Sequence, residues 1–432
     1  MSDQSNRPTG HAFSLSMMMF LQYAVWGIWL PYLANYLTGE KAKGGLGFSG
    51  SEMGWILGLA GSIGAVAAPF MAGQIADRFI NAERWLGILL ILGGVVKFST
   101  AYVTDYTTFL ALSVLYSVFY MPTLALTNSV AFANLKDPEK SFPPVRTWGT
   151  IGWIVASNLF PLLWLQTDIH FTWTPFFFEG TEKANSTQLL ADCLKFSGAI
   201  GVLYGLWAFF FLPRTPPSKS AEAPLAFAKA FNMLGHPGFL IVTLAALPIA
   251  MIHQVYFMRT GPFLESLGFA TSKIGPIMSI GQISEIAFLA CLGLLLKRIG
   301  YKWTIAVGAL AFAARYAIFS FGTPEARNMV AGAMVLHGIC YAFFFAGAYV
   351  YIDRVCAKDI RHSAQTVFGI IILGVGPVLA GAYNQWLDSF ATTDAGLDWH
   401  KLWLVQAAIG LFAAILVAAL FRPGLAKEHT PA

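Results

Sequence analysis

The chain alternates between long apolar runs and short polar stretches. Twelve apolar runs can be counted, each near the ~20 residues that a helix needs to cross a bilayer. They cover residues 13–37, 52–76, 85–104, 108–135, 143–166, 194–213, 237–262, 274–296, 303–322, 328–353, 362–387 and 401–421. Open strands cannot cross lipid, and no run alternates as barrel strands do. We therefore predict an all-α membrane protein with twelve transmembrane helices.

A polar segment lies between the sixth and seventh runs. It carries Arg214, Lys219 and Lys229 and separates two sets of six runs. The pattern predicts an N-terminal six-helix half at residues 1–212, a cytoplasmic linker at 213–236 and a C-terminal six-helix half at 237–432. This layout is typical of transporters built from two repeated halves.

Composition supports the membrane assignment. Of the 432 residues, 56% are hydrophobic and only 11% are charged, whereas soluble proteins carry about 25% charged residues. The net charge of +5 is small and gives no argument for a nucleic-acid partner. The four cysteines lack metal-ligand spacing, and there is no phosphate-binding glycine loop. We therefore expect no metal, no cofactor and no enzymatic activity.

Lysine and arginine are distributed unevenly between the two predicted sides. Sixteen lie on the side of the N-terminus and seven on the other. The positive-inside rule then places both termini in the cytoplasm of a multi-pass protein of the cell (inner or plasma) membrane. The expected partners are the lipid bilayer and a small-molecule substrate, and we expect a monomer.

Residues 142–153 combine two prolines, an arginine and a tryptophan within an apolar run. We expect a helix to begin near Pro143, because proline is tolerated in the first turn. Arg146 then lies one turn inside, and Arg146, Thr150 and Trp153 share one helical face. This face is a candidate substrate-binding surface. The alternative is that Arg146 extends to the cytoplasmic surface.

Glu285 lies in the middle of an apolar run, with Gln282 three residues before it on the same face. An ionisable residue within lipid is costly, so it is a candidate functional residue. A carboxylate here could bind protons and accept hydrogen bonds from substrate hydroxyls. The alternative is a structural hydrogen bond between helices.

A few other polar or aromatic residues also lie inside predicted helices. Gln254 could bind a polar ligand through its donor and its acceptor, whereas His253 beside it more often packs. Tyr341 belongs to an aromatic segment that usually packs but could stack on a planar ligand. Lys97 and Arg315 lie deep in their runs, with no partner that the sequence identifies.

The loop after the second run contains Gly73, Asp77 and Arg78. This loop resembles the G-x-x-x-D-R loop of the major facilitator superfamily. The resemblance implies that the three residues have a gating or structural role, because in that superfamily such charges hold the N-terminal helices in a closed arrangement.

Four blocks resemble the nucleoside:proton symporters of the same superfamily. They are residues 120–124, 142–152, 279–285 and 361–365, in the family's order and spacing. The resemblance implies uptake of nucleosides driven by the proton gradient through alternating access. It also implies that Arg146, Thr150, Gln254, Gln282 and Glu285 line the substrate cavity.

The chain departs from the family pattern at several cavity positions. Trp153 replaces a phenylalanine-like residue, Phe257 an amide, His337 a tyrosine and Ala342 an aspartate. Without that aspartate, Glu285 is the clearest candidate for the carboxylate that couples transport to protons. We expect Trp153, Phe257, His337 and Tyr341 to contact the substrate, so these changes bear on which substrate is carried.

Three alternatives to nucleoside import remain open. The same fold could carry sugars or other polyols, or the chain could be a membrane sensor or structural protein without flux. A polytopic membrane enzyme is the last alternative, and no catalytic constellation supports it.

Overall fold

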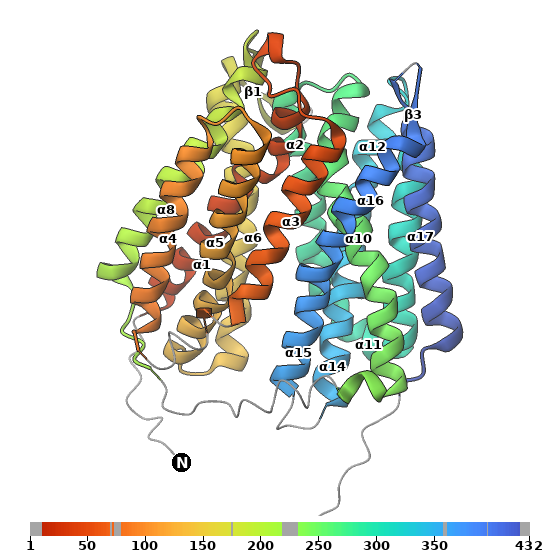
Figure 1. Ribbon diagram of the computed structural model, residues 1–432. Coiled ribbons are helices and arrows are strands. Elements are labelled where there is room, and N and C mark those ends of the chain that lie inside the picture. The colour runs from red at the N-terminus through yellow and green to blue at the C-terminus, as the bar shows by residue number, and fades with distance from the viewer. Residues whose placement is uncertain are drawn as a thin grey trace, which may run out of the picture. The chain divides into compact units, whose positions relative to one another are not determined.

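The computed structural model describes residues 11–69, 71–72, 79–173, 176–217, 232–356, 361–394 and 396–423 (Figure 1). The first part of the chain contains α1 (Ala12–Gly27), α2 (Leu30–Thr38), η2 (Lys41–Lys43), α3 (Gly50–Pro69), α4 (Ala82–Thr100), α5 (Tyr106–Asn134), α6 (Pro138–Phe160), η4 (Pro161–Leu165), β1 (Gln166–Trp173), β2 (Phe176–Glu182), α7 (Ser186–Leu189) and α8 (Ala191–Phe211).

The second part contains η5 (Asn232–Gly235), α10 (Pro237–Ser266), η6 (Thr271–Lys273), α11 (Ile274–Ser320), α12 (Arg327–Ala333), α13 (Leu336–Ile339), η7 (Cys340–Ala346), α14 (Gly347–Val355), α15 (Arg361–Ile370), η8 (Ile371–Val375), α16 (Gly376–Ala391), β3 (Thr392–Thr393), β4 (Gly396–Leu397) and α17 (Trp399–Leu420). The segments η4, η7 and η8 are π-helical turns that continue α6, α13 and α15.

Long apolar helices dominate the described residues, as the hydropathy pattern predicts. Ten helical stretches are long and apolar enough to cross a membrane. α4 is not among the ten and carries three charged residues, Glu83, Arg84 and Lys97. α11 counts once although it contains two of the predicted runs. The two short antiparallel hairpins, β1–β2 and β3–β4, were not predicted and lie between long helices.

The turn inside α11 explains why two predicted helices appear as one element. Gly300 has a φ of 74°, outside the helical region. A residue without a Cβ adopts this left-handed backbone at no steric cost. The chain therefore changes direction at Gly300, between the predicted runs at 274–296 and 303–322.

Backbone contacts divide the chain into two compact units. Unit 1 comprises Met1–Ala221 and Phe257–Ser279, and unit 2 comprises Glu222–Tyr256 and Ile280–Ala432. The units differ from the predicted halves because Phe257–Ser279, which comprises the end of α10, η6 and the start of α11, belongs to unit 1. The predicted halves stay a prediction.

Helix pairs form the interior of unit 1. α4 packs against α8 and α5, α1 against α6, and α3 against α5. Figure 1 shows these elements in red to yellow-green. Buried residues on α4 (Leu86, Leu89 and Leu90) are 2% exposed or less, so these helices bury apolar side chains against one another.

Polar contacts attach Phe257–Ser279 to unit 1. The Lys273 ammonium lies 2.6 Å from the Glu179 carboxylate of β2. The Ser272 N–H donates to Glu182 over 2.8 Å, and the Asn158 amide donates to the Ser279 hydroxyl over 2.7 Å. These contacts connect α6 and β2 with η6 and the start of α11.

In unit 2, α11 packs against η7 and α17. Leu292 of α11 forms a buried cluster with Ala342 and Phe343 of η7. The rings of Tyr316 and Trp403 stack with centroids 5.4 Å apart. These contacts pack α11 against η7 and α17 through apolar and aromatic side chains.

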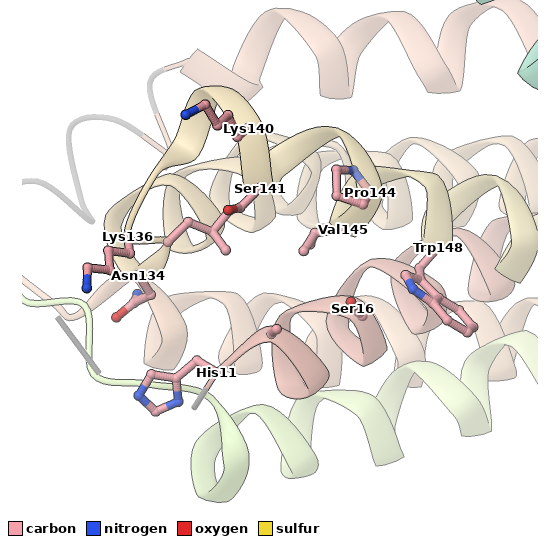
Figure 2. A pocket seen from close by; sticks show the side chains of 11 residues that line it. His11, Ser16, Asn134, Lys136, Lys140, Ser141, Pro144, Val145 and Trp148 are labelled. Carbon is pink, nitrogen blue, oxygen red and sulfur yellow. The ribbon is translucent and has the colours of Figure 1, made fainter. Parts of the chain in front are cut away.

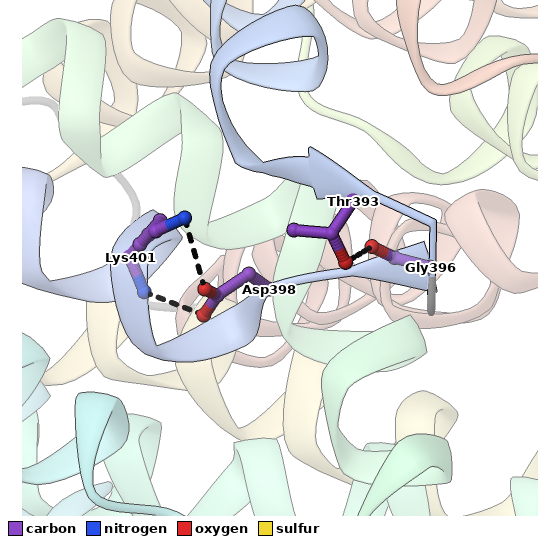
Figure 3. Close-up of polar contacts among 4 residues, drawn as sticks. All are labelled: Thr393, Gly396, Asp398 and Lys401. Atoms are coloured by element: carbon purple, nitrogen blue, oxygen red, sulfur yellow. Dashed lines mark hydrogen bonds and ion pairs between the residues drawn. The ribbon is translucent and has the colours of Figure 1, made fainter.

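Asp398 caps the N-terminus of α17 (Figure 3). Its carboxylate accepts from the Lys401 N–H over 3.0 Å, and the Lys401 ammonium lies 3.5 Å away. The first of these contacts is the main reason that the pKa of Asp398 is lowered. The preceding β3–β4 turn is closed by a hydrogen bond from the Thr393 hydroxyl to the Gly396 carbonyl.

We expect Asp398→Ala to lower the unfolding free energy by about 1 kcal/mol at neutral pH, the usual cost of losing an N-cap. Because the folded pKa is depressed, the stabilisation is present above the unfolded value of about 3.9 and disappears as pH falls through the folded value. Melting temperatures of the purified protein between pH 3 and 7 measure this. Asp398→Asn keeps a side-chain oxygen that accepts the Lys401 N–H, so it should retain the cap without its pH dependence. Equal melting temperatures of the wild type and both variants at every pH would contradict the N-cap role of Asp398.

Candidate functional site

α6 begins earlier than the prolines suggested. The predicted start near Pro143 is wrong: the helix begins at Pro138, after the N-cap Asp137, whose side chain accepts from the Lys140 N–H. Pro143 and Pro144 lie inside the helix. Arg146 is therefore eight residues from the first helical residue, about 12 Å along the axis at 1.5 Å per residue.

Arg146 contacts α1 through an aromatic ring. Its guanidinium carbon lies 4.2 Å from the ring centroid of Tyr23, a cation–π distance. The arginine is half-buried. The contact fixes the direction of the guanidinium, and the alternative that Arg146 reaches the cytoplasmic surface stays open.

Trp153 also faces α1. Thr150, one turn before it on α6, is half-buried. Trp153 is 6% exposed. A Cβ placed on Gly27 of α1 would lie 2.6 Å from the Trp153 carbonyl oxygen and 3.0 Å from its indole. Trp153 is thus part of the α1–α6 interface, a packing role that the sequence did not reveal.

A row of aromatic rings extends from Arg146 to Lys97 inside unit 1. Ring contacts connect Tyr23 to Trp26, Trp26 to Tyr120, Tyr120 to Tyr116 and Tyr116 to Trp29, with centroids 5.3–6.4 Å apart. The buried Lys97 ammonium lies 3.3 Å from the Trp29 centroid and 4.2 Å from that of Tyr116. The partners of Lys97 that the sequence did not identify are therefore ring faces.

Hydrogen bonds brace this row where α1 meets α5. The Gln22 amide donates to the Thr123 hydroxyl over 2.7 Å, and the Tyr120 hydroxyl donates to the Gln22 carbonyl over 2.5 Å. All three side chains are buried. The helix proline Pro122 lies between Tyr120 and Thr123 and has no backbone N–H to donate. The bonds to Gln22 therefore join α1 to α5 beside this missing backbone hydrogen bond.

In unit 2, Gln282 and His337 lie next to each other. His337 Nε2 is 3.2 Å from the Gln282 side-chain amide. Glu285, one turn further along α11, is 9% exposed. The predicted pair Gln282 and Glu285 therefore occupies one face of α11, with His337 beside it.

Arg315 completes this cluster, and the sequence did not place it there. Its guanidinium is fully buried and donates to His337 Nδ1 over 2.6 Å and to the Tyr316 hydroxyl over 2.8 Å. It also lies over the rings of Tyr256, Tyr316 and Phe312, at 4.4, 4.7 and 5.3 Å. No local sequence pattern connects Arg315 with His337, because the contact depends on how two helices rotate toward each other.

A close backbone approach brings α13 against α11. A Cβ on Gly338 would lie 2.5 Å from the Glu285 backbone nitrogen. Ser284 supports the approach, since its hydroxyl donates to the Val335 carbonyl over 2.9 Å. Only a residue without a side chain fits between the helices, so Gly338 holds His337 at bonding distance from Gln282.

We expect Gly338→Val to push the two helices apart and lower the unfolding free energy by about 1–3 kcal/mol, as overpacking does. Thermal unfolding of the detergent-purified protein measures this. Gly332→Val is the matched control, because no described residue lies within 4 Å of a Cβ at that position. Equal melting temperatures for the two variants would contradict the close approach.

The remaining predicted site residues are distributed over both units. Phe257 belongs to unit 1 with Arg146, Thr150 and Trp153; Gln254 and Tyr341 belong to unit 2 with Gln282, Glu285 and His337. Gln254, Phe257 and Tyr341 are half-buried. The loop residues Gly73, Asp77 and Arg78 lie outside the described residues.

A cavity of about 460 Å³ lies in unit 1 where α1, α5 and α6 approach one another (Figure 2). His11, Lys136 and Lys140 line one end and Trp148 the other. None of the predicted substrate-binding residues lines it. Within the described ranges, no group of three His, Cys, Asp or Glu residues could hold a metal ion.

Comparisons with known proteins decide the family. The family model described as nucleoside H+ symporter matches residues 9–425. The chain belongs to the nucleoside H+ symporter family. Xanthosine permease of Escherichia coli (strain K12) is 29% identical over 438 residues, which cover 97% of both chains. Nucleoside permease NupG of the same organism is 28% identical over 426 residues, covering 94% of this chain and 95% of the permease.

Solved structures agree with this family assignment. The crystal structure of the nucleoside transporter NupG matches with a TM-score of 0.81 and 26% identity, over 96% of this chain and 100% of that one. The D-xylose-proton symporter matches with a TM-score of 0.72 and 14% identity, over 96% of this chain and 99% of that one, and shows the fold alone. This nucleoside H+ symporter family member is therefore a multi-pass membrane transporter with the major facilitator fold.

Proposed function

We propose that this chain imports nucleosides together with protons across the inner or plasma membrane, as a monomer with both termini in the cytoplasm. The observation that carries the proposal is the placement of Gln282 and Glu285 on one face of α11, in a chain that matches the nucleoside H+ symporter model over residues 9–425. An ionisable residue within a membrane helix is costly and is retained for function.

The proposed roles follow the chemistry of each group. Gln282 and Glu285 hydrogen-bond the ribose hydroxyls, and Glu285 binds the coupled proton. Gln254 and half-buried aromatic residues, Phe257 and Tyr341 among them, contact the base. In unit 1, Arg146 presents its guanidinium to a polar edge of the substrate, and Thr150 and Trp153 continue that face.

Transport by alternating access requires contacts that form and break. The bonds from Glu179 and Glu182 to Lys273 and Ser272 connect the predicted N-terminal half with the predicted C-terminal half. They are polar and partly exposed, so breaking these bonds themselves costs little. We propose that these contacts of Glu179 and Glu182 with Lys273 and Ser272 break on the outer side during each transport cycle.

A transport assay with purified protein tests the proposal. Proteoliposomes with an imposed inward proton gradient should concentrate labelled uridine, and unlabelled nucleosides should compete whereas sugars should not. Competition by sugars alone would favour a polyol carrier. Absence of any flux would favour a membrane sensor.

A further inference from the structure

We propose that Arg315 is a positioning residue that acts through His337 to turn the Gln282 amide, so that its NH₂ group faces the substrate as an obligatory hydrogen-bond donor. The inference rests on the proposed function for the identity of the substrate. The hydrogen-bond chain itself is a property of unit 2 alone.

The first step concerns the His337 tautomer. Arg315 NH1 lies 2.6 Å from His337 Nδ1. A guanidinium has five N–H donors and no acceptor, so Nδ1 must be the acceptor and carries no proton. A neutral imidazole has its proton on the other nitrogen, which makes His337 Nε2 a donor.

The second step concerns the orientation of the Gln282 amide. His337 Nε2 and the Gln282 amide nitrogen occupy positions 3.2 Å apart. Two N–H groups cannot form a hydrogen bond with each other, and a 180° rotation exchanges the amide nitrogen and oxygen without changing the shape of the side chain. The stable arrangement therefore directs Gln282 Oε1 at His337 and the NH₂ group away from it.

The third step is the anchor of the chain. The Tyr316 hydroxyl donates to the Ile252 carbonyl over 2.8 Å, so its oxygen is available to accept from Arg315 NH2. Three aromatic rings surround the guanidinium. Donors therefore run outward from Arg315 in two directions, through the Tyr316 hydroxyl to the Ile252 carbonyl of α10 and through His337 to Gln282.

The consequence is a defined requirement on the substrate. The Gln282 NH₂ group supplies only donors to the ligand, whereas an ionised Glu285 supplies only acceptors. A pair of this kind matches a hydroxyl group, or two adjacent ones, that accepts from Gln282 and donates to Glu285. An aliphatic or fully methylated group at the same place could form neither bond, which costs affinity.

Nitrogen-15 NMR of histidine-labelled protein tests the tautomer directly. The His337 signals are those lost in His337→Asn. We expect a protonated Nε2 and an unprotonated Nδ1 in the wild type and in Arg315→Lys, whose ammonium can also donate. In Arg315→Met we expect a mixture of tautomers. A protonated Nδ1 in the wild type, or an unchanged tautomer in Arg315→Met, would overturn the proposal.

Uridine exchange in proteoliposomes without a proton gradient tests the consequence. We expect Arg315→Met to raise the KM for uridine about tenfold, the value of one hydrogen bond, with a smaller change in maximal rate. Arg315→Lys should recover most of the affinity. Arg327→Met, at an exposed arginine of α12, is the control and should leave KM unchanged.

The two measurements separate the possible failures. An unchanged KM in Arg315→Met with an altered tautomer would refute the positioning role. An equal collapse of KM and rate in Arg315→Met and Arg315→Lys would show a structural role instead. If the wild type exchanges no nucleoside, the proposed function fails, and the NMR result still decides the hydrogen-bond chain.

Discussion

Glu285→Gln is expected to abolish proton-driven accumulation of nucleosides while exchange of nucleosides across the membrane continues. The amide keeps the size of the side chain and an acceptor oxygen, but it cannot take up a proton at any physiological pH. A driving force of about 100 mV supplies about 2.3 kcal/mol per proton, a concentration ratio of roughly fortyfold. The variant should reach a ratio near one.

The measurement is uridine accumulation in proteoliposomes, with and without an imposed proton gradient. Glu265→Gln is the matched control: Glu265 accepts from the Thr271 hydroxyl over 2.6 Å at the end of α10, and glutamine can accept the same bond. If Glu285→Gln still accumulates uridine, Glu285 is not the proton-binding residue. The same conclusion follows if accumulation is lost only in Glu265→Gln.

Hydropathy predicts most of this fold, because lipid allows few alternatives to apolar helices. It does not predict where helices break or start. At Gly300 the chain turns without a loop, so the two predicted helices on either side form the single element α11. The N-cap Asp137 with Pro138 starts α6 before the prolines that appeared to mark its beginning. These details depend on single residues rather than on the apolar pattern.

The site was predictable only in part, for a related reason. Helical periodicity places Gln282 and Glu285 on one face of one helix. It cannot say that Arg315 meets His337, or that Lys97 lies over Trp29, because those contacts depend on the rotation of separate helices. It places Trp153 on the face of Arg146 and Thr150, but it does not show that the indole also lies against Gly27 of α1.

Trp153→Ala is expected to lower the unfolding free energy by about 3–5 kcal/mol, the usual cost of truncating a buried tryptophan. Trp153 is 6% exposed, and its backbone and indole lie against Gly27 of α1. Alanine would leave a cavity in the α1–α6 interface that the two close-packed backbones cannot fill. Thermal unfolding in detergent and the yield of monodisperse protein measure the loss.

Trp148→Ala on the same helix is the matched control, because Trp148 is 45% exposed and its truncation removes much less buried contact. If both variants melt alike, Trp153 does not stabilise the interface. Trp153→Phe separates packing from recognition, since phenylalanine keeps most of the buried area. Because most of the buried contact is kept, we expect this variant to remain folded. A changed order of preference among nucleosides in its competition assay would then assign the indole to the substrate, whereas an unchanged order would leave Trp153 with packing alone.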